Sequence, residues 1–162
     1  MVKSIGPKKI NVAVFISGTG SNFKNLVIHS FKRNSKFRIE LVISNNPKAK
    51  GLDYANKFKV KKRIIHYSNI GYAEKKIIFE LQKNKIDLIC LAGFMKILSR
   101  NFIKKYSGKI LNIHPSLLPK YKGLETHERA ISNKEKYSGC TVHFVSPKLD
   151  SGKIILQKKV KI

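Results

Sequence analysis

The sequence is poor in the residues that mark disulfide-rich, disordered and collagen-like proteins. Its 162 residues include two cysteines, and both Cys90 and Cys140 lie inside apolar segments (DLICLAG and GCTVHFV) with no C-x-x-C spacing. They are predicted to be reduced, buried thiols. Only ten glycines and five prolines occur, and no Ser- or Gln-rich tract interrupts the chain, which excludes disordered and low-complexity classes. A single globular domain over residues 1–162 is expected.

Long apolar runs are also missing. No segment reaches 18 consecutive apolar residues, and the run INVAVFI at 10–16 is too short to cross a bilayer. That run ends in SGTGS without a small-residue cleavage pattern, so it does not resemble a secretory signal. We therefore expect a cytoplasmic protein with no membrane partner.

Acidic residues are scarce: nine Asp and Glu face 34 Lys and Arg, for a formal charge of +25. Such a charge suggests a nucleic-acid partner, but 29 of the basic residues are Lys and five are Arg, whereas base-edge recognition favours Arg. The lysines run along the whole chain in company with Ile and Asn, as a drift toward A/T-rich codons would produce. We favour that cause and expect no nucleic-acid partner, with a basic binding surface as the alternative.

Short β-branched runs alternate with amphipathic stretches, which predicts βαβ units around a mainly parallel sheet. The solid apolar runs fit strands buried on both faces. Strands are predicted at 10–16, 38–43, 62–65, 87–91, 109–113, 140–146 and 154–160, and helices at 22–32, 51–58, 71–84, 99–106 and 125–133. The predicted fold class is α/β, and ligands in such sheets bind beyond the carboxyl ends of the strands.

The loop after the first predicted strand reads SGTGSN at 17–22 and leads directly into a helix. A Gly-rich turn at a helix N-terminus presents free N–H groups to a phosphate. Phe23 stands where a dinucleotide motif has its third glycine, and the Gly-Lys-Ser/Thr of a P-loop is absent. The pattern therefore suggests a phosphate seat at Gly20, Ser21 and Asn22, or a plain helix-capping turn.

The fifth predicted strand runs into LNIHPSLLPKYKG at 111–123, where Asn112 and His114 are two residues apart and point to the same side. An amide and an imidazole placed in this way can donate two hydrogen bonds to one oxyanion, as acyl transfer requires. A histidine that merely caps the strand end is the alternative.

Asp150 lies in a turn between the last two predicted strands, and it is one of only three Asp residues. A carboxylate near His114 would hold the imidazole cationic, although turn chemistry alone also explains an Asp beside a Gly. His143 alternates with apolar neighbours and is predicted to be a packed histidine behind the site. A metal bound by His114, His143 and Asp150 is disfavoured because no ligand spacing supports it, so we expect no metal.

The loop after the fourth predicted strand, LAGFMKILS at 91–99, is apolar at the edge where ligands bind. Such a loop is more often part of the core. If it lines a cleft, a flat aromatic ligand would suit Met95, Ile97 and Leu98.

Taken together, four segments resemble the phosphoribosylglycinamide formyltransferases, in order and spacing and over nearly the whole chain. The segments are SGTGSNF at 17–23, LAGFMKILS at 91–99, NIHPSLLPKYKGLETH at 112–127 and VHFVSPKLDSGKIILQ at 142–157. The resemblance implies a Rossmann-like formyltransferase fold, a mainly parallel twisted sheet flanked by helices with an antiparallel C-terminal edge. It implies formyl transfer from 10-formyltetrahydrofolate, the co-substrate, to the amine of glycinamide ribonucleotide in purine biosynthesis.

The same resemblance assigns roles to individual residues. Asn112, His114 and Asp150 match the catalytic set, and Gly20, Ser21 and Asn22 match the loop that binds the substrate phosphate. The folate-binding residues it implies are Met95, Lys96, Ile97, Leu98 and Asn112. No catalytic position departs from the family pattern.

Three alternatives remain beside this interpretation. Initiator-tRNA formyltransferase shares the Asn-x-His element, but here Pro115 follows His114 in place of Ala, and a deformylase usually carries an N-terminal regulatory domain. A noncatalytic, basic nucleic-acid-binding remnant is the third. The chain also ends at Ile162, before the family's usual C-terminal helical segment, so we expect weak substrate binding and either self-association as a homodimer or marginal stability.

Overall fold

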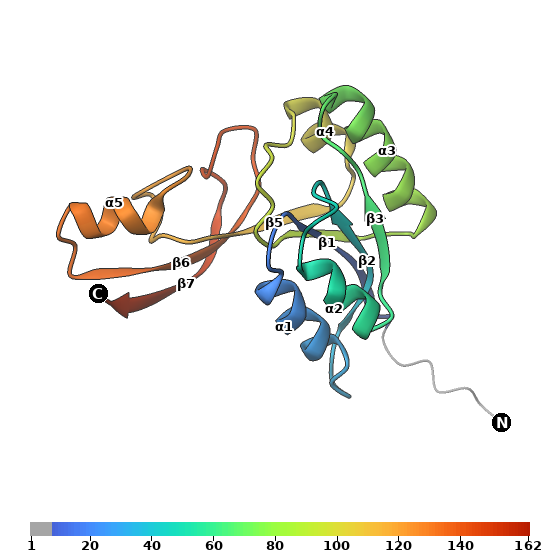
Figure 1. The fold of residues 1–162 in the computed structure, drawn as a ribbon, viewed down its shortest axis with the longest axis horizontal. Helices are drawn as coiled ribbons and strands as arrows, with labels where there is room; N and C mark the ends of the chain where they lie inside the picture. The colour runs from blue at the N-terminus through green and yellow to red at the C-terminus, as the bar shows by residue number, and fades with distance from the viewer. Residues whose placement is uncertain (1–7) are drawn as a thin grey trace. The chain divides into compact units, whose positions relative to one another are not determined.

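A computed structural model describes residues 8–162 of the chain. These residues form two compact units that divide between Ile97 and Leu98 (Figure 1). The first unit contains β1 (Ile10–Ile16), α1 (Ser21–Ser30), β2 (Phe37–Ser44), α2 (Gly51–Lys57), β3 (Lys61–Ile64), α3 (Ile70–Lys83) and β4 (Leu88–Leu91). The second contains α4 (Arg100–Lys105), β5 (Lys109–His114), α5 (Thr126–Ser132), β6 (Tyr137–Phe144) and β7 (Ile154–Lys161).

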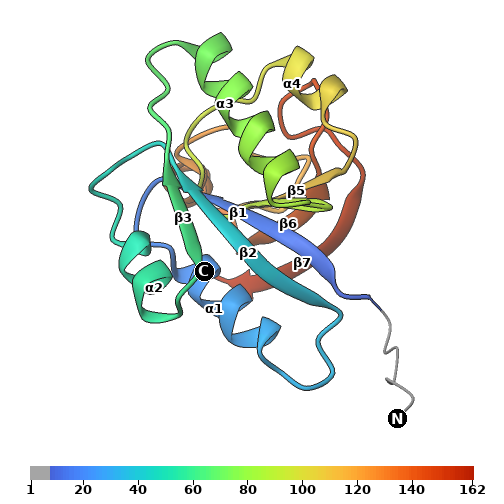
Figure 2. The same ribbon diagram turned by 90° about the vertical axis from the view of Figure 1, so that its right-hand side faces the viewer.

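The first unit is a parallel sheet in the order β3-β2-β1-β4. Helices α1 and α2 cover one face and α3 covers the other (Figure 2). Because β1 is central, its side chains are buried on both faces: Val12 and Val14 pack toward Phe23 and Val27 of α1. This double burial explains why the strand is a continuous apolar run.

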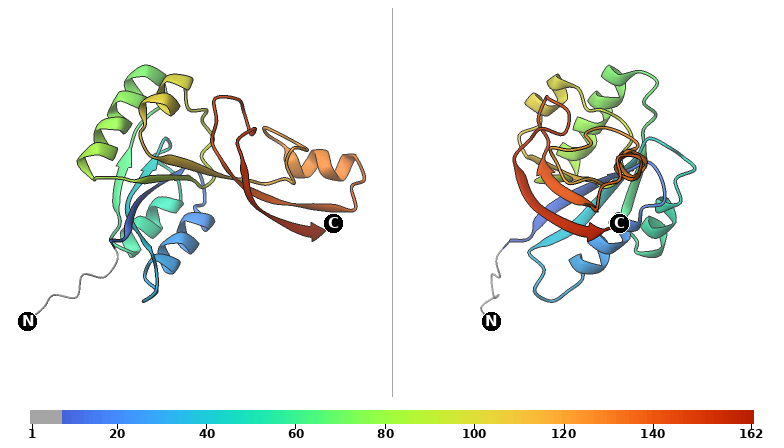
Figure 3. Two further views of the ribbon diagram at one scale, coloured as in Figure 1. Left: turned by 180° about the vertical axis from the view of Figure 1, so that it is seen from behind. Right: turned by 90° about the vertical axis from the view of Figure 1, so that its left-hand side faces the viewer.

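The second unit contains the antiparallel strands β5, β6 and β7. Helix α5 lies beside the β6–β7 hairpin (Figure 3). The register aligns Asn112 with His143 and His114 with Thr141 across β5 and β6. It continues from Thr141 to Gln157 on β7. Polar side chains predicted from separate motifs therefore occupy neighbouring positions on paired strands.

The predicted fold class is confirmed, with parallel strands between helices in one unit and antiparallel C-terminal strands in the other. The twelve predicted elements are all present. The largest boundary difference is in β6, predicted at 140–146 and observed at Tyr137–Phe144. Its early start follows from the pairing of Tyr137 with Lys161, which a search for apolar runs does not detect.

The prediction of buried cysteines is wrong, since both Cys90 and Cys140 are free thiols of intermediate exposure. The reason is the alternation of side chains along a strand. Thr141 and His143 take the buried face of β6, which leaves Cys140 on the other face. Cys90 packs only partly against the core on the α1–α2 side of its sheet, although this burial raises its pKa to about 11.

Over residues 8–162, the helices are too short or too polar for any of them to cross a lipid bilayer.

Candidate active site

The loop between β1 and α1 is held in a fixed shape against α2. Gly20 has a left-handed backbone, with φ of +71°, and a Cβ there would lie 2.5 Å from the Cα of Gly51. The Gly51 N–H also donates to the Gly18 carbonyl at 3.0 Å. This close approach of two backbones explains the need for glycine at position 20.

The same loop is tied to the ends of two neighbouring strands. Ser17 Oγ donates to Asn45 Oδ1 at 2.5 Å and accepts from the Met95 N–H at 2.8 Å. The Ser17 N–H donates to the Gly93 carbonyl at 3.0 Å. A pocket of about 190 Å³ results. Its lining comprises Ser17, Gly18, Thr19, Gly20, Ser21, Asn22, Ala92, Gly93 and Met95.

The pocket contains the N-terminus of α1, whose first turn has no side-chain cap. The first N–H groups of a helix have no partner within it and lie at its positive end. The three predicted phosphate-binding residues, Gly20, Ser21 and Asn22, thus line one small pocket. The geometry is suited to an anion such as a phosphate.

The segment after β4 differs from a core loop at most of its positions. Met95 is 65% exposed and Ile97 is 71% exposed, and Lys96 is also exposed. Leu98, which begins the second unit, is buried. Of the predicted ligand-facing residues Met95 to Leu98, only Leu98 therefore belongs to the core, while Met95 reaches the pocket formed by the loop after β1. Exposed apolar side chains of this kind suit a ligand with an apolar face.

In the second unit, the structure brings the predicted catalytic side chains together around Asp150. Its Oδ2 lies 3.5 Å from Nδ1 of His114, and its Oδ1 lies 3.6 Å from Nε2 of His143. Asn112 Nδ2 lies 3.2 Å from the same nitrogen of His143. Both imidazoles are almost completely buried. Four residues from β5, from β6 and from the turn before β7 thus form one cluster.

Asp150 is fixed by the backbone as well as by the histidines. It adopts a left-handed conformation with φ of +43°, which Asp tolerates better than most residues. The Gly123 N–H donates to its Oδ2 at 2.9 Å. The carboxylate therefore has partners on both oxygens and a defined orientation.

The electrostatics favour an ionised Asp150, which in turn raises the pKa of His143. Burial acts to raise the pKa of Asp150, but the neighbouring His143 imidazole, the hydrogen bond from the Gly123 N–H and the charges of both histidines outweigh it and lower the pKa. The Asp150 carboxylate is also the main cause that raises the pKa of His143, against burial, with help from the Phe144 carbonyl. A carboxylate and an imidazolium stabilise each other in this arrangement.

His114 is held by a contact that the sequence did not reveal. Its Nε2 lies 2.8 Å from the Tyr121 carbonyl. A carbonyl can only accept, so Nε2 carries the hydrogen. A second proton, on Nδ1, would be donated toward Asp150.

Other functional partners were also missed by the sequence reasoning. Thr141 and Gln157 bond to the loop that follows His114. A glutamine between apolar residues in IILQ was the available signal. Among residues 8–162, no three His, Cys, Asp or Glu side chains are grouped so that they could hold a metal ion.

Comparison with known proteins identifies this architecture. The sequence pattern of the family described as "Formyl transferase" matches residues 10–162. The chain is 46% identical over 162 residues to the human "Trifunctional purine biosynthetic protein adenosine-3", covering 98% of this chain but 16% of that protein. The chain thus spans only a small part of the length of such relatives.

Relatives of closer length share a single name. The "Phosphoribosylglycinamide formyltransferase" of Haemophilus influenzae is 43% identical, with 93% of this chain and 73% of that protein covered. The crystal structure of the enzyme of that name from Anaplasma phagocytophilum superimposes with a TM-score of 0.90 at 40% identity, over 96% of this chain and 73% of that one. The structure from Brucella melitensis also gives 0.90, at 39% identity, over 96% and 81%. Since sequence and fold agree over almost all of its length, the chain belongs to the phosphoribosylglycinamide formyltransferase family.

Proposed function

We propose that the chain transfers a formyl group from 10-formyltetrahydrofolate to the amine of glycinamide ribonucleotide, a step of purine biosynthesis. The observation that carries the proposal is the cluster in which Asp150 contacts His114 and His143, with Asn112 bound to His143. Acyl transfer to an amine needs stabilisation of an oxyanion and removal of a proton. This cluster contains groups for both tasks.

The amine nitrogen attacks the formyl carbon, and the carbonyl electron pair moves onto oxygen. Asn112 Nδ2 has two hydrogens, so it can donate one to that oxyanion and the other to Nε2 of a neutral His143. His114, protonated and beside Asp150, supplies positive charge. In the tetrahedral adduct the former amine loses a proton to Asp150. The oxyanion then re-forms the carbonyl as the bond to the folate nitrogen breaks, and that nitrogen takes up the proton from Asp150.

The phosphate of glycinamide ribonucleotide is assigned to the N-terminus of α1. Gly20, Ser21 and Asn22 line the pocket there, and the uncapped first turn offers N–H donors to a dianion. Because this contact involves a part of the substrate that does not react, its main effect is on substrate affinity.

The folate is assigned to Met95, Lys96, Ile97, Leu98 and Asn112. Two observations support this assignment. Met95 and Ile97 are exposed and so are not part of the core, and the chain matches the formyl transferase family. An aromatic pterin would cover these apolar side chains. Small-molecule substrates and a cytoplasmic location follow from this proposal, which includes no metal, membrane or nucleic-acid partner.

Steady-state assays of the purified 162-residue chain test the function directly. Saturable formation of N-formylglycinamide ribonucleotide, identified by mass, with release of tetrahydrofolate is the expected result. Formate release without transfer would indicate a deformylase instead. A chain that formylates an initiator tRNA but not the ribonucleotide would contradict the substrate assignment.

The matched control is Asp150→Asn, which keeps the size of the side chain and removes its charge. Transfer that persists unchanged in this variant would place the reaction elsewhere in the chain.

A further inference from the structure

Three paired residues on the antiparallel strands lie where the loop 115–121 begins. His114 on β5 pairs with Thr141 on β6, and Thr141 pairs with Gln157 on β7. The loop 115–121 leaves the sheet directly after His114, and its last residue, Tyr121, lies against His114 again. Its position is therefore open to control from the neighbouring strands.

Both hydrogens of the Gln157 amide nitrogen form hydrogen bonds, one to this loop and one to Thr141. Nε2 donates to the Leu118 carbonyl at 2.9 Å and to Thr141 Oγ1 at 2.9 Å. All residues of β7, including Gln157, are exposed. Among the described residues of β7, Gln157 is the one whose side chain forms an observed hydrogen bond with this loop.

Thr141 also binds the 115–121 loop, and its hydroxyl has no hydrogen-bonding capacity left. Its hydroxyl donates to the Ser116 carbonyl at 2.6 Å, and it accepts from the Leu118 N–H at 3.1 Å and from Gln157. A hydroxyl has one donor and two acceptor sites, so all three are used. The side chain is fully buried, and loss of any partner there would leave polar groups unsatisfied.

The far end of the clamped loop contacts the catalytic histidine. Ser116 Oγ donates to the Lys120 carbonyl at 2.7 Å and closes the turn. The next carbonyl, that of Tyr121, lies 2.8 Å from His114 Nε2. The chain of contacts thus runs from Gln157 through Leu118 to the carbonyl that orients the imidazole.

We propose that Gln157 is a positioning residue: with Thr141 it holds the 115–121 loop so that the Tyr121 carbonyl fixes the orientation and proton position of His114. The catalytic consequence rests on the proposed function, whereas the effect on His114 does not. A histidine that turns freely would spend less time in the reactive geometry, and small misplacements are costly in catalysis.

The test compares Gln157→Met, which keeps the length of the side chain without its donors, with Lys159→Met on the same strand face. Lys159 lies over the Tyr137 ring and serves as the control. Two readouts are measured: hydrogen exchange of the His114 Nε2 proton by NMR, and the separate kcat and KM values. We expect Gln157→Met to exchange about tenfold faster and to lose about tenfold in kcat, with both KM values nearly unchanged.

Thr141→Val and Thr141→Ser provide an independent check should Gln157→Met be poorly folded. The valine variant should show the same two effects, and the serine variant, which keeps the hydroxyl, should restore both. Unchanged exchange in Gln157→Met and Thr141→Val would overturn the proposal, as would a loss confined to KM or shared by Lys159→Met. Faster exchange with normal kcat would also overturn it. If the unmodified chain transfers no formyl group, the proposed function fails, and the exchange measurement still decides whether Gln157 positions His114.

Discussion

The proposed chemistry depends on Asp150, because its carboxylate lies next to two buried histidines. Its oxygens face different partners, His114 on one side and His143 on the other. Removal of a partner from a buried charged group leaves the remaining charge uncompensated. The roles of these residues are therefore coupled and should not be separable by single substitutions.

His114→Ala and Asp150→Asn should each lower formyl transfer by about 100-fold or more, because each removes part of one charge-stabilising unit. The double variant should lose little more than either single variant. The measurement is kcat/KM for the four proteins, with melting temperatures to confirm folding. A double variant whose loss equals the product of the two single losses would show that the residues act independently.

The His143–Asp150 pair should make folding stability depend on pH. The pKa of His143 is raised from 6.5 in the folded chain, so its contribution is present below 6.5 and is lost as pH rises through the folded value. The pKa of Asp150 is lowered from 3.8, so its contribution is present above 3.8 and is lost on acidification. The pair should be most stabilising between these limits.

We therefore expect the melting temperature of the unmodified chain to fall between pH 6 and pH 9 by more than that of His143→Gln. Calorimetric scans of both proteins in matched buffers provide the comparison. Parallel curves for the two proteins would mean that His143 does not titrate with folding in this range.

At the scale of elements, the sequence predicted strands and helices well because each βα unit has a clear apolar period and a clear turn. The loop SGTGSN was also interpretable, since Gly and Ser at a strand-to-helix junction have a direct physical meaning. Contacts that depend on strand register were not predictable. The proximity of Asp150 to His114 arises from antiparallel pairing of β5 and β6, and no local pattern encodes the approach of Tyr121 to the imidazole.

The close contact between the phosphate loop and α2 gives a prediction for Gly20→Ala. The left-handed backbone alone costs an alanine about 1–2 kcal/mol, and its Cβ would meet Gly51 at 2.5 Å. The loop should shift, and the KM for glycinamide ribonucleotide should rise while folate affinity is retained. Gly18→Ala is the matched control for stability, because nothing lies within 4 Å of its added Cβ. Equal melting temperatures for the two variants would contradict the packing argument.

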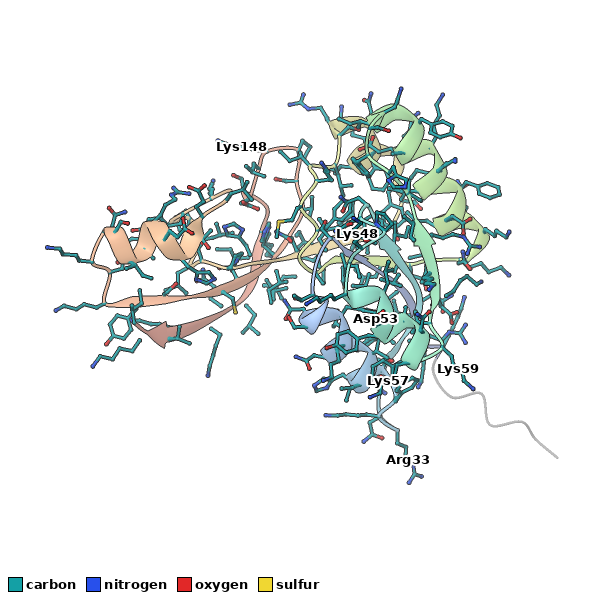
Figure 4. All side chains as sticks on the ribbon, viewed as in Figure 1. Arg33, Lys48, Asp53, Lys57, Lys59 and Lys148 are labelled. Carbon is teal, nitrogen blue, oxygen red and sulfur yellow. The ribbon has the colours of Figure 1, made fainter. Side chains whose placement is uncertain are left out.

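At the scale of the whole molecule, the excess of positive charge has no counterpart in the proposed site. The basic residues labelled in Figure 4, Arg33, Lys48, Lys57 and Lys59 on the first unit and Lys148 on the second, are all exposed. Arg33 follows α1 and Lys148 lies in the loop before β7, while Lys48 precedes α2, Lys57 ends it and Lys59 follows it. These five residues are thus spread over several elements and do not lie on a single one.

The last prediction concerns the consequence of this charge for binding. A chain of charge +25 must attract any polyanion at low salt, and release of counterions makes such binding fall steeply as salt rises. We expect mixed tRNA and random duplex DNA to bind with similar affinity at 50 mM salt and to be lost near physiological salt. Formyl transfer should change little over that range, because the phosphate contact at α1 is made largely by backbone N–H groups. Fluorescence anisotropy titrations at several salt concentrations measure the first effect, and kcat/KM under the same conditions measures the second.

Binding of one nucleic acid that persists at physiological salt would contradict this prediction. It would mean that some of these lysines form a specific surface, because a purely electrostatic interaction does not discriminate between sequences.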